Sequence, residues 1–545
     1  MKKLFILIIL FFVSILIYGQ LYDMILTGDP VLQDLRFLTI ETGRPFLSFS
    51  PPLSQSEIKK YLDKIDESLL SAPALEAYNR ILNRLNPTAP FLSYSDEIFS
   101  AHLNVNLNLV GRIRFNEDVS WEPYNSKIEP FAAFPVRFFF SDFIQLYAEP
   151  GISMRTGAYG NGSADLNIPT GYYEYNSSMP LRVFAAAGGS FWNFQLGRDR
   201  LYWGTANLGS LTFNDNSPYM EYARLSLFSS SFKYSLLINQ MPLTLHDSLF
   251  NIPGWDLPEN LRNSQQRYLY LHRFDFTLFD RVNIGLMEGV IVGNSSIELR
   301  YLNPLMIFHS FFSWENYDKW KSPYDGSDGF INGSIISLEL NWNIIKNLAF
   351  YGQIVINDFA TSSEMEEDPS DWRPNGVGYL AGITYSHSFK DWGAVFYLEF
   401  LYTDPYLYML SSPFASFIQL DLHENDYNYY LLGFSRDTIG LTLGAHIFNN
   451  DTLNFTGSLS WISRGSHNKD GVKWDWQKGE EAFNETTPSG IAENKFILSI
   501  GGTWKPYPWL LFKTNITGIL SFNNNHVQGN NTQSAQVSVT AGFRY

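Results

Sequence analysis

The chain has 545 residues, no cysteine and a formal net charge of −16, and 45% of its residues are hydrophobic and 17% aromatic. The lack of cysteine excludes a lipidated N-terminus, disulfides, iron–sulfur clusters and thiol catalysis, and the acidic balance argues against a nucleic-acid partner, which would favour a basic face. Outside the extreme N-terminus no run of about 18 apolar residues occurs, so any membrane contact has to use strands rather than helices.

The first 19 residues have the three parts of a secretory signal peptide. The basic start Met1-Lys2-Lys3 is followed by an apolar stretch from Leu4 to Tyr18 and then by Gly19-Gln20. We predict cleavage after Gly19. An uncleaved N-terminal anchor is the alternative, because Ile17 is bulky for a position two residues before the cut.

Residues 20–95 have a helical pattern and are predicted to form a periplasmic helical segment. Ser54-Gln55-Ser56-Glu57 has capping-box spacing. Apolar residues recur behind it at helical intervals, at Ile58, Tyr61, Leu62, Ile65 and Leu69. Pro73 opens a second helix, whose apolar stripe consists of Leu75, Tyr78, Leu82 and Leu85 and which Asn86-Pro87 ends. We expect these two helices to pack on each other and on the mouth of a barrel; a membrane-surface role is the alternative.

From about residue 101 the apolar period changes to two. Leu103, Val105, Leu107 and Leu109 alternate with Asn and other polar residues over more than ten positions, the length that a tilted membrane strand needs. Later runs are joined by tight turns, such as those at Ser141-Asp142, Phe279-Asp280 and Lys390-Asp391. Between such pairs lie long polar stretches, at residues 156–178, 242–266, 315–330, 359–376 and 464–493.

This asymmetry of short turns and long loops is typical of bacterial outer-membrane barrels. The sequence therefore predicts, for residues 96–545, a closed antiparallel transmembrane β-barrel of about 18–22 strands, with closure removing the exposed sheet edges. The runs near residues 295–314 and 413–463 are the weakest. The final segment alternates from Ala535 to Phe543 and ends on Tyr545, which predicts a terminal strand read by the barrel-assembly machinery rather than an ordinary edge strand.

Several short motifs follow one another along the chain. They are Pro52-Leu53-Ser54 leading into Glu57-Ile58, Gly197-Arg198 with Trp203-Gly204, Tyr268 through Arg273 to Glu288 and Gly293, Tyr301-Leu302-Asn303-Pro304, Phe350-Tyr351-Gly352-Gln353 with Asn357-Asp358-Phe359, and Leu398-Glu399-Phe400 with Asp404-Pro405-Tyr406. In this order they resemble the motifs of the Wzi family of capsule-assembly outer-membrane proteins. The resemblance implies a non-enzymatic outer-membrane lectin, in which a small helical bundle lies at the periplasmic end of a barrel that helps to tie exported polysaccharide to the cell surface. The long loops, residues 464–493 above all, would be expected to set which glycan is bound.

The residues themselves point to no catalytic chemistry, metal or cofactor. The nine His residues are scattered without metal-ligand spacing, and nothing positive supports a serine triad. Charged residues within the strands mostly share the polar parity and are expected to face the lumen, where paired charges can seal it, because charge facing lipid is costly. These are Arg112, Arg114, Glu149, Arg182, Asp275, Glu288, Glu298, Arg300, Glu339 and Glu399.

A carbohydrate ligand suits the remaining polar and aromatic residues, because sugars offer hydroxyls to amides and charged groups and ring faces to Trp and Tyr. The candidate ligand-binding residues are Arg198, Arg200, Trp203, Glu288, Glu298, Arg300, Asn303, Trp474 and Trp476. A membrane girdle uses the same aromatic residues, but Trp474 and Trp476 lie deep within a long loop. Arg198 and Arg200 have the parity opposite to Asp199, so they lie above the bilayer unless Gly197 introduces a bulge.

The leading hypothesis is an outer-membrane protein that binds surface or capsular polysaccharide and assists capsule assembly or attachment. Its other expected partners are outer-membrane lipid and the barrel-assembly machinery. The alternative is a porin or uptake channel, because a wide barrel can leave an aqueous lumen. A lipid-modifying barrel enzyme ranks last, since no catalytic constellation emerges.

Overall fold

The computed structural model describes residues 23–85, 90–116, 119, 130–141, 143–154, 164–168, 173–175, 182–214, 219–241, 266–293, 297–306, 332–359, 374–410, 415–420, 429–449, 452–468 and 479–545. The predicted signal peptide and the loop residues Trp474 and Trp476 lie outside these ranges. Within them, no helix has the length and apolar character needed to cross a membrane.

A helical segment precedes the strands, as predicted, but it holds three α-helices rather than two. They are α2 (Val31–Thr42), α3 (Gln55–Leu62) and α4 (Ala72–Leu85), with a 3₁₀ turn, η1 (Glu67–Leu69), between the last two. The predicted capping box opens α3: Glu57 N donates to Ser54 Oγ, and Glu57 Oε1 accepts from Ser54 N. Helix α2 escaped prediction because Pro30, at its N-cap, provides no capping side chain. Leu69, predicted on the apolar stripe of α3, lies in η1 and is exposed.

The rest of the described chain is mainly strands. Their bounds are β1 (Leu92–Ser95), β2 (Phe99–Leu103), β3 (Asn106–Phe115), β4 (Ala132–Ala133), β5 (Val136–Phe140), β6 (Ile144–Ala148), β7 (Gly151–Met154), β8 (Ala164–Leu166), β9 (Tyr173–Tyr175), β10 (Val183–Gly188), β11 (Trp192–Asp199), β12 (Met220–Phe228), β13 (Phe232–Gln240), β14 (Arg267–Leu278), β15 (Val282–Gly293), β16 (Asn332–Ile345), β17 (Leu348–Asp358), β18 (Gly376–Phe389), β19 (Trp392–Thr403), β20 (Ile418–Leu420), β21 (Tyr429–Leu431), β22 (Thr438–Asn449), β23 (Leu453–Arg464), β24 (Glu493–Tyr507), β25 (Leu510–Phe522) and β26 (Thr532–Arg544). Short helical turns lie between some of them: η2 (Leu299–Leu302), η4 (Ser466–Asn468), α7 (Glu480–Phe483) and η5 (Asn524–His526).

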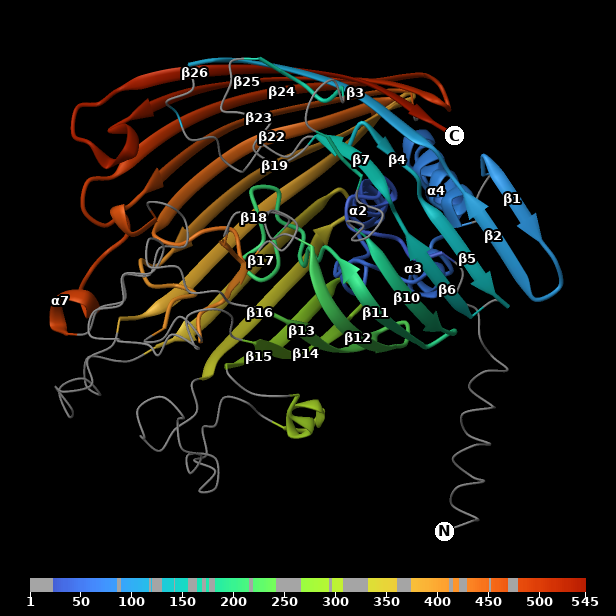
Figure 1. The fold of residues 1–545 in the computed structure, drawn as a ribbon, viewed down its shortest axis with the longest axis horizontal. Coiled ribbons are helices and arrows are strands. Elements are labelled where there is room, and N and C mark those ends of the chain that lie inside the picture. Colours follow the sequence, from blue (N-terminus) through green and yellow to red (C-terminus); the bar gives the residue numbers. More distant parts are fainter. Residues whose placement is uncertain are drawn as a thin grey trace, which may run out of the picture.

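The strands pair antiparallel into a closed ring (Figure 1). From β10 each strand pairs with the next as far as β19, β19 pairs with β22, and the ladder continues to β26. β26 then pairs with β3, from Ala535 opposite Phe115 to Arg544 opposite Asn106. The circuit closes through β2–β5, β3–β4, β4–β7, β5–β6, β6–β10 and β7–β9.

With β2–β3, β4–β5, β6–β7 and β9–β10 each counted as one strand, the described residues form a ring of eighteen strands, at the lower end of the predicted range. The weak sequence runs account for the excess in the prediction. The described part of residues 295–314 contains η2, and β20 and β21 form a separate two-stranded sheet. Residues 156–178, predicted as a loop without strands, include the short strands β8 and β9.

The barrel wall has an apolar outer face. On β24, Phe496, Leu498 and Ile500 are 43%, 52% and 54% exposed, whereas the alternate residues Lys495 and Ile497 are buried. The same alternation recurs on β3, where Leu109, Ile113 and Phe115 are exposed. Large apolar side chains that stay exposed along neighbouring strands form the band that lipid covers in a membrane barrel.

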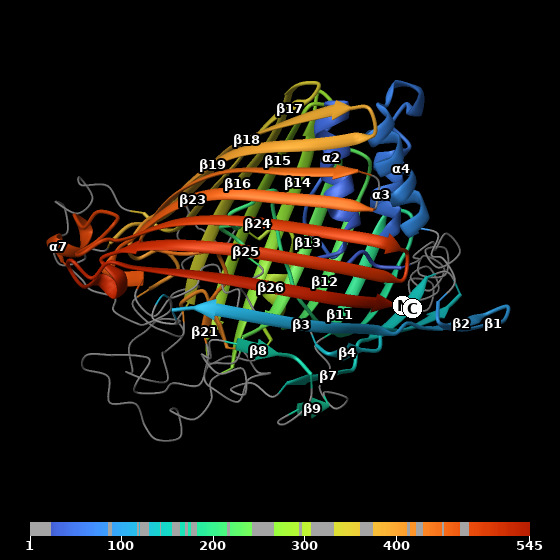
Figure 2. The ribbon, with the colours of Figure 1, turned by 90° about the horizontal axis from the view of Figure 1, so that it is seen from above.

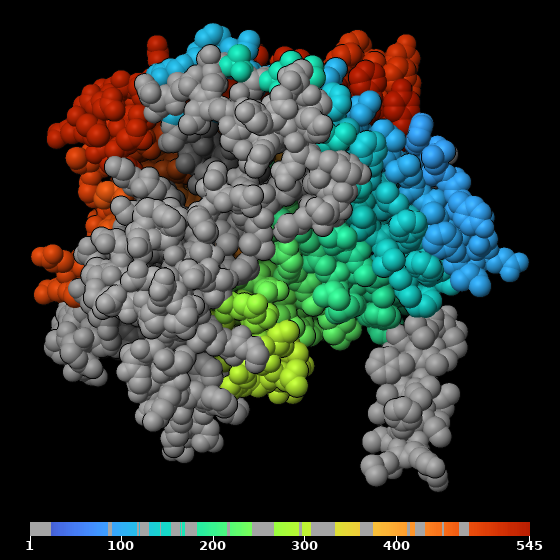
Figure 3. Space-filling view, viewed as in Figure 1, coloured from blue at the N-terminus to red at the C-terminus, as the bar shows by residue number. Residues whose placement is uncertain are grey.

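Aromatic rings gather at the end of the barrel that carries the short turns and the C-terminus. The ring of Trp509 lies 6.3 Å from that of Phe543 and 6.2 Å from that of Tyr545, and Trp504 stacks on Phe512 at 5.6 Å. Such a girdle marks a membrane–water interface. The hairpin β1–β2 projects beyond this end of the molecule, as Figure 3 shows.

The helical segment lies at the same end as the short turns, as Figure 2 shows, and α7 lies at the other end. Phe37 of α2 and Tyr61 of α3 share one apolar cluster with the wall residues Ala349, Val395 and Phe448. Since the short turns of such barrels face the periplasm, this end is periplasmic and the long loops are at the outer end. The prediction that the helices pack on each other and on the barrel mouth is confirmed.

Asp23 ties the start of the described chain to this end of the barrel. Its carboxylate lies 2.8 Å from Arg84 Nη1 on α4 and 3.2 Å from Arg137 Nε on β5, and it accepts a hydrogen bond from Gln145 at 2.6 Å. Burial opposes ionisation, but the two guanidinium groups outweigh it and hold the pKa of Asp23 below its ordinary value.

A carboxyl with a lowered pKa stabilises the fold above its unfolded-state pKa and loses that contribution as the pH falls through its folded-state pKa. We therefore expect the melting temperature of the detergent-solubilised protein to fall on acidification below about pH 5, and to fall less steeply in Asp23→Asn. Parallel melting curves across a pH series check this. Equal slopes in the two proteins would contradict it.

Candidate functional site

Three interior segments fill the lumen. Residues 201–214 follow β11, and residues 404–420 and 429–437 lie between β19 and β22 as far as the structure describes them. Backbone hydrogen bonds join them: Asn214 N donates to Leu432 O at 2.8 Å, and Phe434 N donates to Ser210 O at 2.9 Å. Together these interior segments form one layer across the barrel.

The core of this layer is apolar and shared with the wall. Its fully buried members include Trp203, Phe213, Leu407 and Tyr408, which pack against inward-facing residues of β13 to β19 such as Leu271. A cluster of this kind excludes water at the height where it lies.

Polar side chains of the wall hold the interior segments in place through hydrogen bonds to the backbone of those segments. Glu399 accepts hydrogen bonds from Asn207 N at 2.8 Å, from Leu208 N at 2.7 Å and from the Tyr351 hydroxyl at 2.5 Å. Glu399 is fully buried, and these donors satisfy a carboxylate that would otherwise be costly to bury. The prediction that it faces the lumen is confirmed.

Arg267 and Asn357 form hydrogen bonds to the backbone of the interior segment at residues 404–420. Arg267 donates to Ser416 O at 2.7 Å and to Ile418 O at 2.6 Å. Asn357 accepts from Tyr408 N at 3.0 Å and donates to Met409 O at 3.2 Å. Sequence reasoning missed these roles because polar residues on the inner parity of a strand look the same whether they face water or protein.

Other charges inside the barrel pair with one another. Arg273 Nη2 lies 2.7 Å from Asp275 Oδ1 and 3.1 Å from Glu339 Oε2, and all three side chains are buried. For Asp275 and Glu339 the predicted lumen-facing, paired role is confirmed.

A polar cluster joins two of the interior segments to residues 464–493, at the outer end. Glu485 Oε2 lies 2.8 Å from His467 Nε2 and accepts from the Tyr406 hydroxyl at 3.0 Å. Beside it, Asp437 accepts from the Ser489 hydroxyl at 2.6 Å and from His467 N at 3.1 Å. We call these five residues the outer polar cluster. Sequence reasoning did not find it, because its members come from three separate parts of the chain and share no motif.

The structure places Arg198 and Arg200 near each other on the wall, each held by protein groups. Arg198 Nη1 donates to Glu221 Oε1 at 2.9 Å, and the Arg200 guanidinium lies 5.3 Å from the centre of the Tyr219 ring. The ladder runs through Gly197 without a register shift, so the bulge considered as an alternative is wrong. A Cβ at Gly197 would lie 2.3 Å from Val183 O, which explains the glycine by the close approach of β10.

Trp203 is not available for sugar stacking. Its side chain is 0% exposed; Phe213 packs edge-on at 4.8 Å, and Arg273 lies 5.5 Å from the ring centre. The prediction that Trp203 contacts the ligand is therefore wrong. The tryptophan belongs to the core of the interior layer.

Glu288, Glu298 and Arg300 were predicted to face the lumen, and that placement is wrong. Met287 belongs to the lumen core, so Glu288, the next residue on β15, points to the outer face, where it pairs across the strands with His272. η2, the yellow-green turn below β15 in Figure 1, lies on this outer face.

The contacts of η2 show how it is held there. Tyr301 stacks on Tyr270 at 5.0 Å, and His272 Nε2 donates to Tyr301 O at 2.9 Å. Glu298 and Arg300 form an ion pair at 2.9 Å, and Asn303 is exposed. The predicted site residues that the structure describes therefore lie in three places and are not brought together. These are the wall at Arg198 and Arg200, the interior layer at Trp203, and the outer face at Glu288, Glu298, Arg300 and Asn303.

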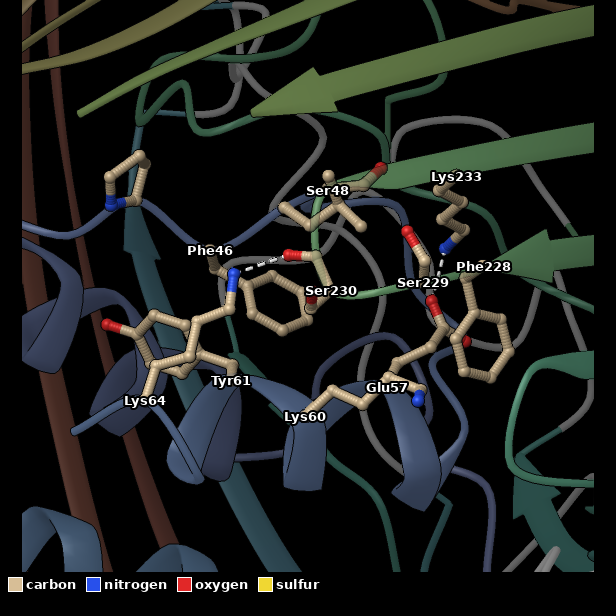
Figure 4. A pocket seen from close by; sticks show the side chains of 12 residues that line it. Phe46, Ser48, Glu57, Lys60, Tyr61, Lys64, Phe228, Ser229, Ser230 and Lys233 are labelled. Carbon is tan, nitrogen blue, oxygen red and sulfur yellow. Dashed lines mark hydrogen bonds and ion pairs between the residues drawn. The ribbon is translucent and has the colours of Figure 1, made fainter. Parts of the chain in front are cut away.

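One cavity at the periplasmic end is too small for a sugar. It lies between α3 and the β12–β13 turn, where Figure 4 shows Glu57 reaching Lys233 and Lys64 reaching Ser230. Its volume is about 20 Å³, which is room for a single water molecule. No group of three or more His, Asp or Glu side chains in the described ranges is arranged to hold a metal ion.

The closed strand ring, its apolar outer band and its aromatic girdle define the chain as an outer-membrane β-barrel. Sequence comparison with protein-family models and with curated proteins found no match. Comparison of structures found Wzi of Escherichia coli, described as an outer-membrane protein involved in group 1 capsule assembly and as a carbohydrate-binding β-barrel. The chain is 15% identical to Wzi, and the match covers 95% of this chain and 99% of Wzi with a TM-score of 0.57. The predicted resemblance is thus confirmed at the level of the fold.

Two more distant barrels also match. OprD of Pseudomonas aeruginosa is 9% identical over 82% of this chain and 94% of its own, with a TM-score of 0.41. OmpT of Vibrio cholerae is 8% identical over 83% of this chain and 100% of its own, with a TM-score of 0.32.

Proposed function

We propose that this protein binds surface or capsular polysaccharide at its outer end and assists capsule assembly or attachment, without enzymatic activity. The observation that carries the proposal is the likeness to Wzi over nearly the whole length of both chains. The filled lumen supports it against a diffusion channel, because packed side chains occupy the path at the level of the interior segments. Outer-membrane lipid and the barrel-assembly machinery are the other partners that we propose.

Glu485, at the exposed edge of the outer polar cluster, is the described group that best suits a glycan. Glu485 is 28% exposed, and its carboxylate is already oriented by His467 and Tyr406. An oriented carboxylate accepts hydrogen bonds from sugar hydroxyls without a further ordering cost. Trp474 and Trp476 precede Glu485 on the same loop and are the proposed stacking residues.

The geometry of this cluster supports a binding rather than a catalytic role. A serine triad needs the serine hydroxyl to donate to the histidine ring. Here the Ser489 hydroxyl donates to Asp437, and the ring nitrogen Nε2 of His467 faces Glu485. A lipopolysaccharide deacylation assay tests this: release of acyl groups by purified protein would overturn the non-enzymatic part of the proposal.

We expect purified protein to retain a capsular or cell-surface glycan on a glycan array. Glu485→Gln should weaken that binding about tenfold, because a hydrogen bond to a charged group is replaced by a neutral one. The double variant Trp474→Ala, Trp476→Ala should also weaken glycan binding, because it removes the proposed stacking. Glu298→Gln on the outer wall is the matched control and should bind as the wild type does.

A deletion strain tests the cellular role. It should lose polysaccharide from the cell surface, and the wild-type gene, but not the Trp474→Ala, Trp476→Ala variant, should restore it. If no glycan binds and the deletion strain keeps its polysaccharide layer, the proposed function is wrong.

A further inference from the structure

The lipid-facing wall has one hollow that the function proposed above does not use. It spans β23 to β26 and β3, which lie side by side in Figure 2. Its volume is about 620 Å³, within the range of about 300–1,000 Å³ that is typical of ligand pockets. All of its lining residues are in the described part of the chain.

The hollow arises from one row of side chains across neighbouring strands. In the row Leu459–Leu498–Gly518–Ala535–Phe115, each residue is paired with the next by the strand register. Gly518 and Ala535 make a low floor two strands wide, and the large side chains rise on both sides of it. Nothing lies within 4 Å of a Cβ built on Gly518, so the floor is open.

One row of side chains bounds the hollow along the barrel axis. Toward the outer end, Phe496 pairs with Leu520, and Leu520 pairs with Gln533. Trp461 stands in that row opposite Phe496, and its indole nitrogen donates to Asn494 Oδ1 at 3.3 Å. A tryptophan with its polar edge bonded and its ring on an apolar wall is typical of the membrane–water interface. The hollow therefore lies just inside the hydrocarbon edge of the outer leaflet.

The chemistry of the lining selects an apolar occupant. The row that forms the hollow is aliphatic and aromatic, without a charged side chain, and the polar groups Gln533 and Asn116 lie at its outer rim. Flexible hydrocarbon fits a hollow of this kind, because it fills irregular apolar surface and needs no hydrogen-bond partner.

We propose that this hollow is a binding site for an acyl chain of the outer-leaflet glycolipid, with the headgroup of that lipid at the polar rim. A second copy of the protein is a poorer occupant. A two-fold contact would set hollow against hollow, and two concave surfaces leave a void between them. The site is continuous with the lipid-facing band, so its occupant already surrounds the protein.

Gly518→Leu tests the site, because it fills the floor without meeting a neighbour. Gly457→Leu is the matched control: Gly457 lies on the same outer wall, and a Cβ built there also meets nothing within 4 Å. Full-length protein in mild detergent would be titrated with purified lipid A and, separately, with phosphatidylethanolamine, and the bound lipid would be counted by native mass spectrometry. Heat-modifiable mobility on a gel verifies that both variants are folded.

We expect wild type and Gly457→Leu to retain one lipid A that Gly518→Leu loses, with weaker retention of phosphatidylethanolamine. Equal retention of lipid A by folded Gly518→Leu would overturn the site. Equal retention of the two lipids by the wild type would overturn the assignment to the outer-leaflet glycolipid. A wild-type dimer that Gly518→Leu converts to a monomer would show instead that a second copy occupies the hollow.

Discussion

Replacing the two stretches of chain that contain the interior segments with short glycine–serine turns should convert the protein from a non-conducting barrel into an open channel. The variant removes residues 200–219 and 404–437, which contain the three interior segments. The register permits it: Asp199 pairs with Met220, and Thr403 pairs with Thr438, so each excision ends on adjacent strands. The wall itself stays closed through β26 and β3.

An eighteen-stranded wall without this layer is wide enough to hold an aqueous lumen. The periplasmic helices leave one side of the mouth free, since Thr456 and Lys513 on the inner wall near that end are exposed. In planar bilayers we expect no conductance steps from the wild type and steady open steps from the double excision.

Single excisions are the controls for this experiment. Removal of residues 200–219 alone leaves Leu407 and Tyr408 in the lumen, so it should give no more than brief openings. Steady conductance of the wild type would show that the interior segments do not seal the barrel, and would favour the porin alternative. A folded double excision that stays closed would show that the seal is elsewhere.

The barrel could be predicted from sequence because alternation depends on one strand at a time. Each residue on β24 faces either lipid or the interior. Phe496, Leu498 and Ile500 therefore identify the outer face of this strand even when the neighbouring strands are unknown. The capping box at Ser54 is local in the same way. The pattern at Ala535 to Tyr545 predicted a terminal strand, and the structure shows that this strand, β26, closes the ring by pairing with β3.

The interior layer could not be predicted, because its contacts are long-range. Trp203 resembles a surface aromatic in the sequence, and its burial depends on Phe213 and on wall residues far along the chain. Glu288 was assigned to the lumen on the general cost of charge facing lipid. η2 covers that part of the outer wall and gives His272, the cross-strand partner of Glu288, a protein neighbour there instead. The alternation within one strand does not show whether another part of the chain, such as η2, covers its outer face.

Removing one charge of the Glu57–Lys233 pair should release the helical segment from the barrel. Both side chains are buried, Lys233 Nζ donates to Glu57 Oε2, and Lys233 also reaches Ser50 Oγ at 3.0 Å. Glu57→Ala leaves an uncompensated buried ammonium, which costs about 3–5 kcal/mol. We expect trypsin to digest the helical segment in this variant while the barrel stays intact on a gel.

Three further variants separate the ion pair from the other roles of these residues. Ser54→Ala removes a capping oxygen and should cost about 1 kcal/mol, and Lys64→Met removes an exposed bond to Ser230 O and should cost less than about 1 kcal/mol. Glu57→Leu with Lys233→Met replaces both charges by apolar groups, so it should be more resistant to trypsin than Glu57→Ala, because no charge is left unpaired. If Glu57→Ala resists digestion as well as Ser54→Ala does, the apolar contacts of α2 and α4 with the wall hold the segment without the ion pair.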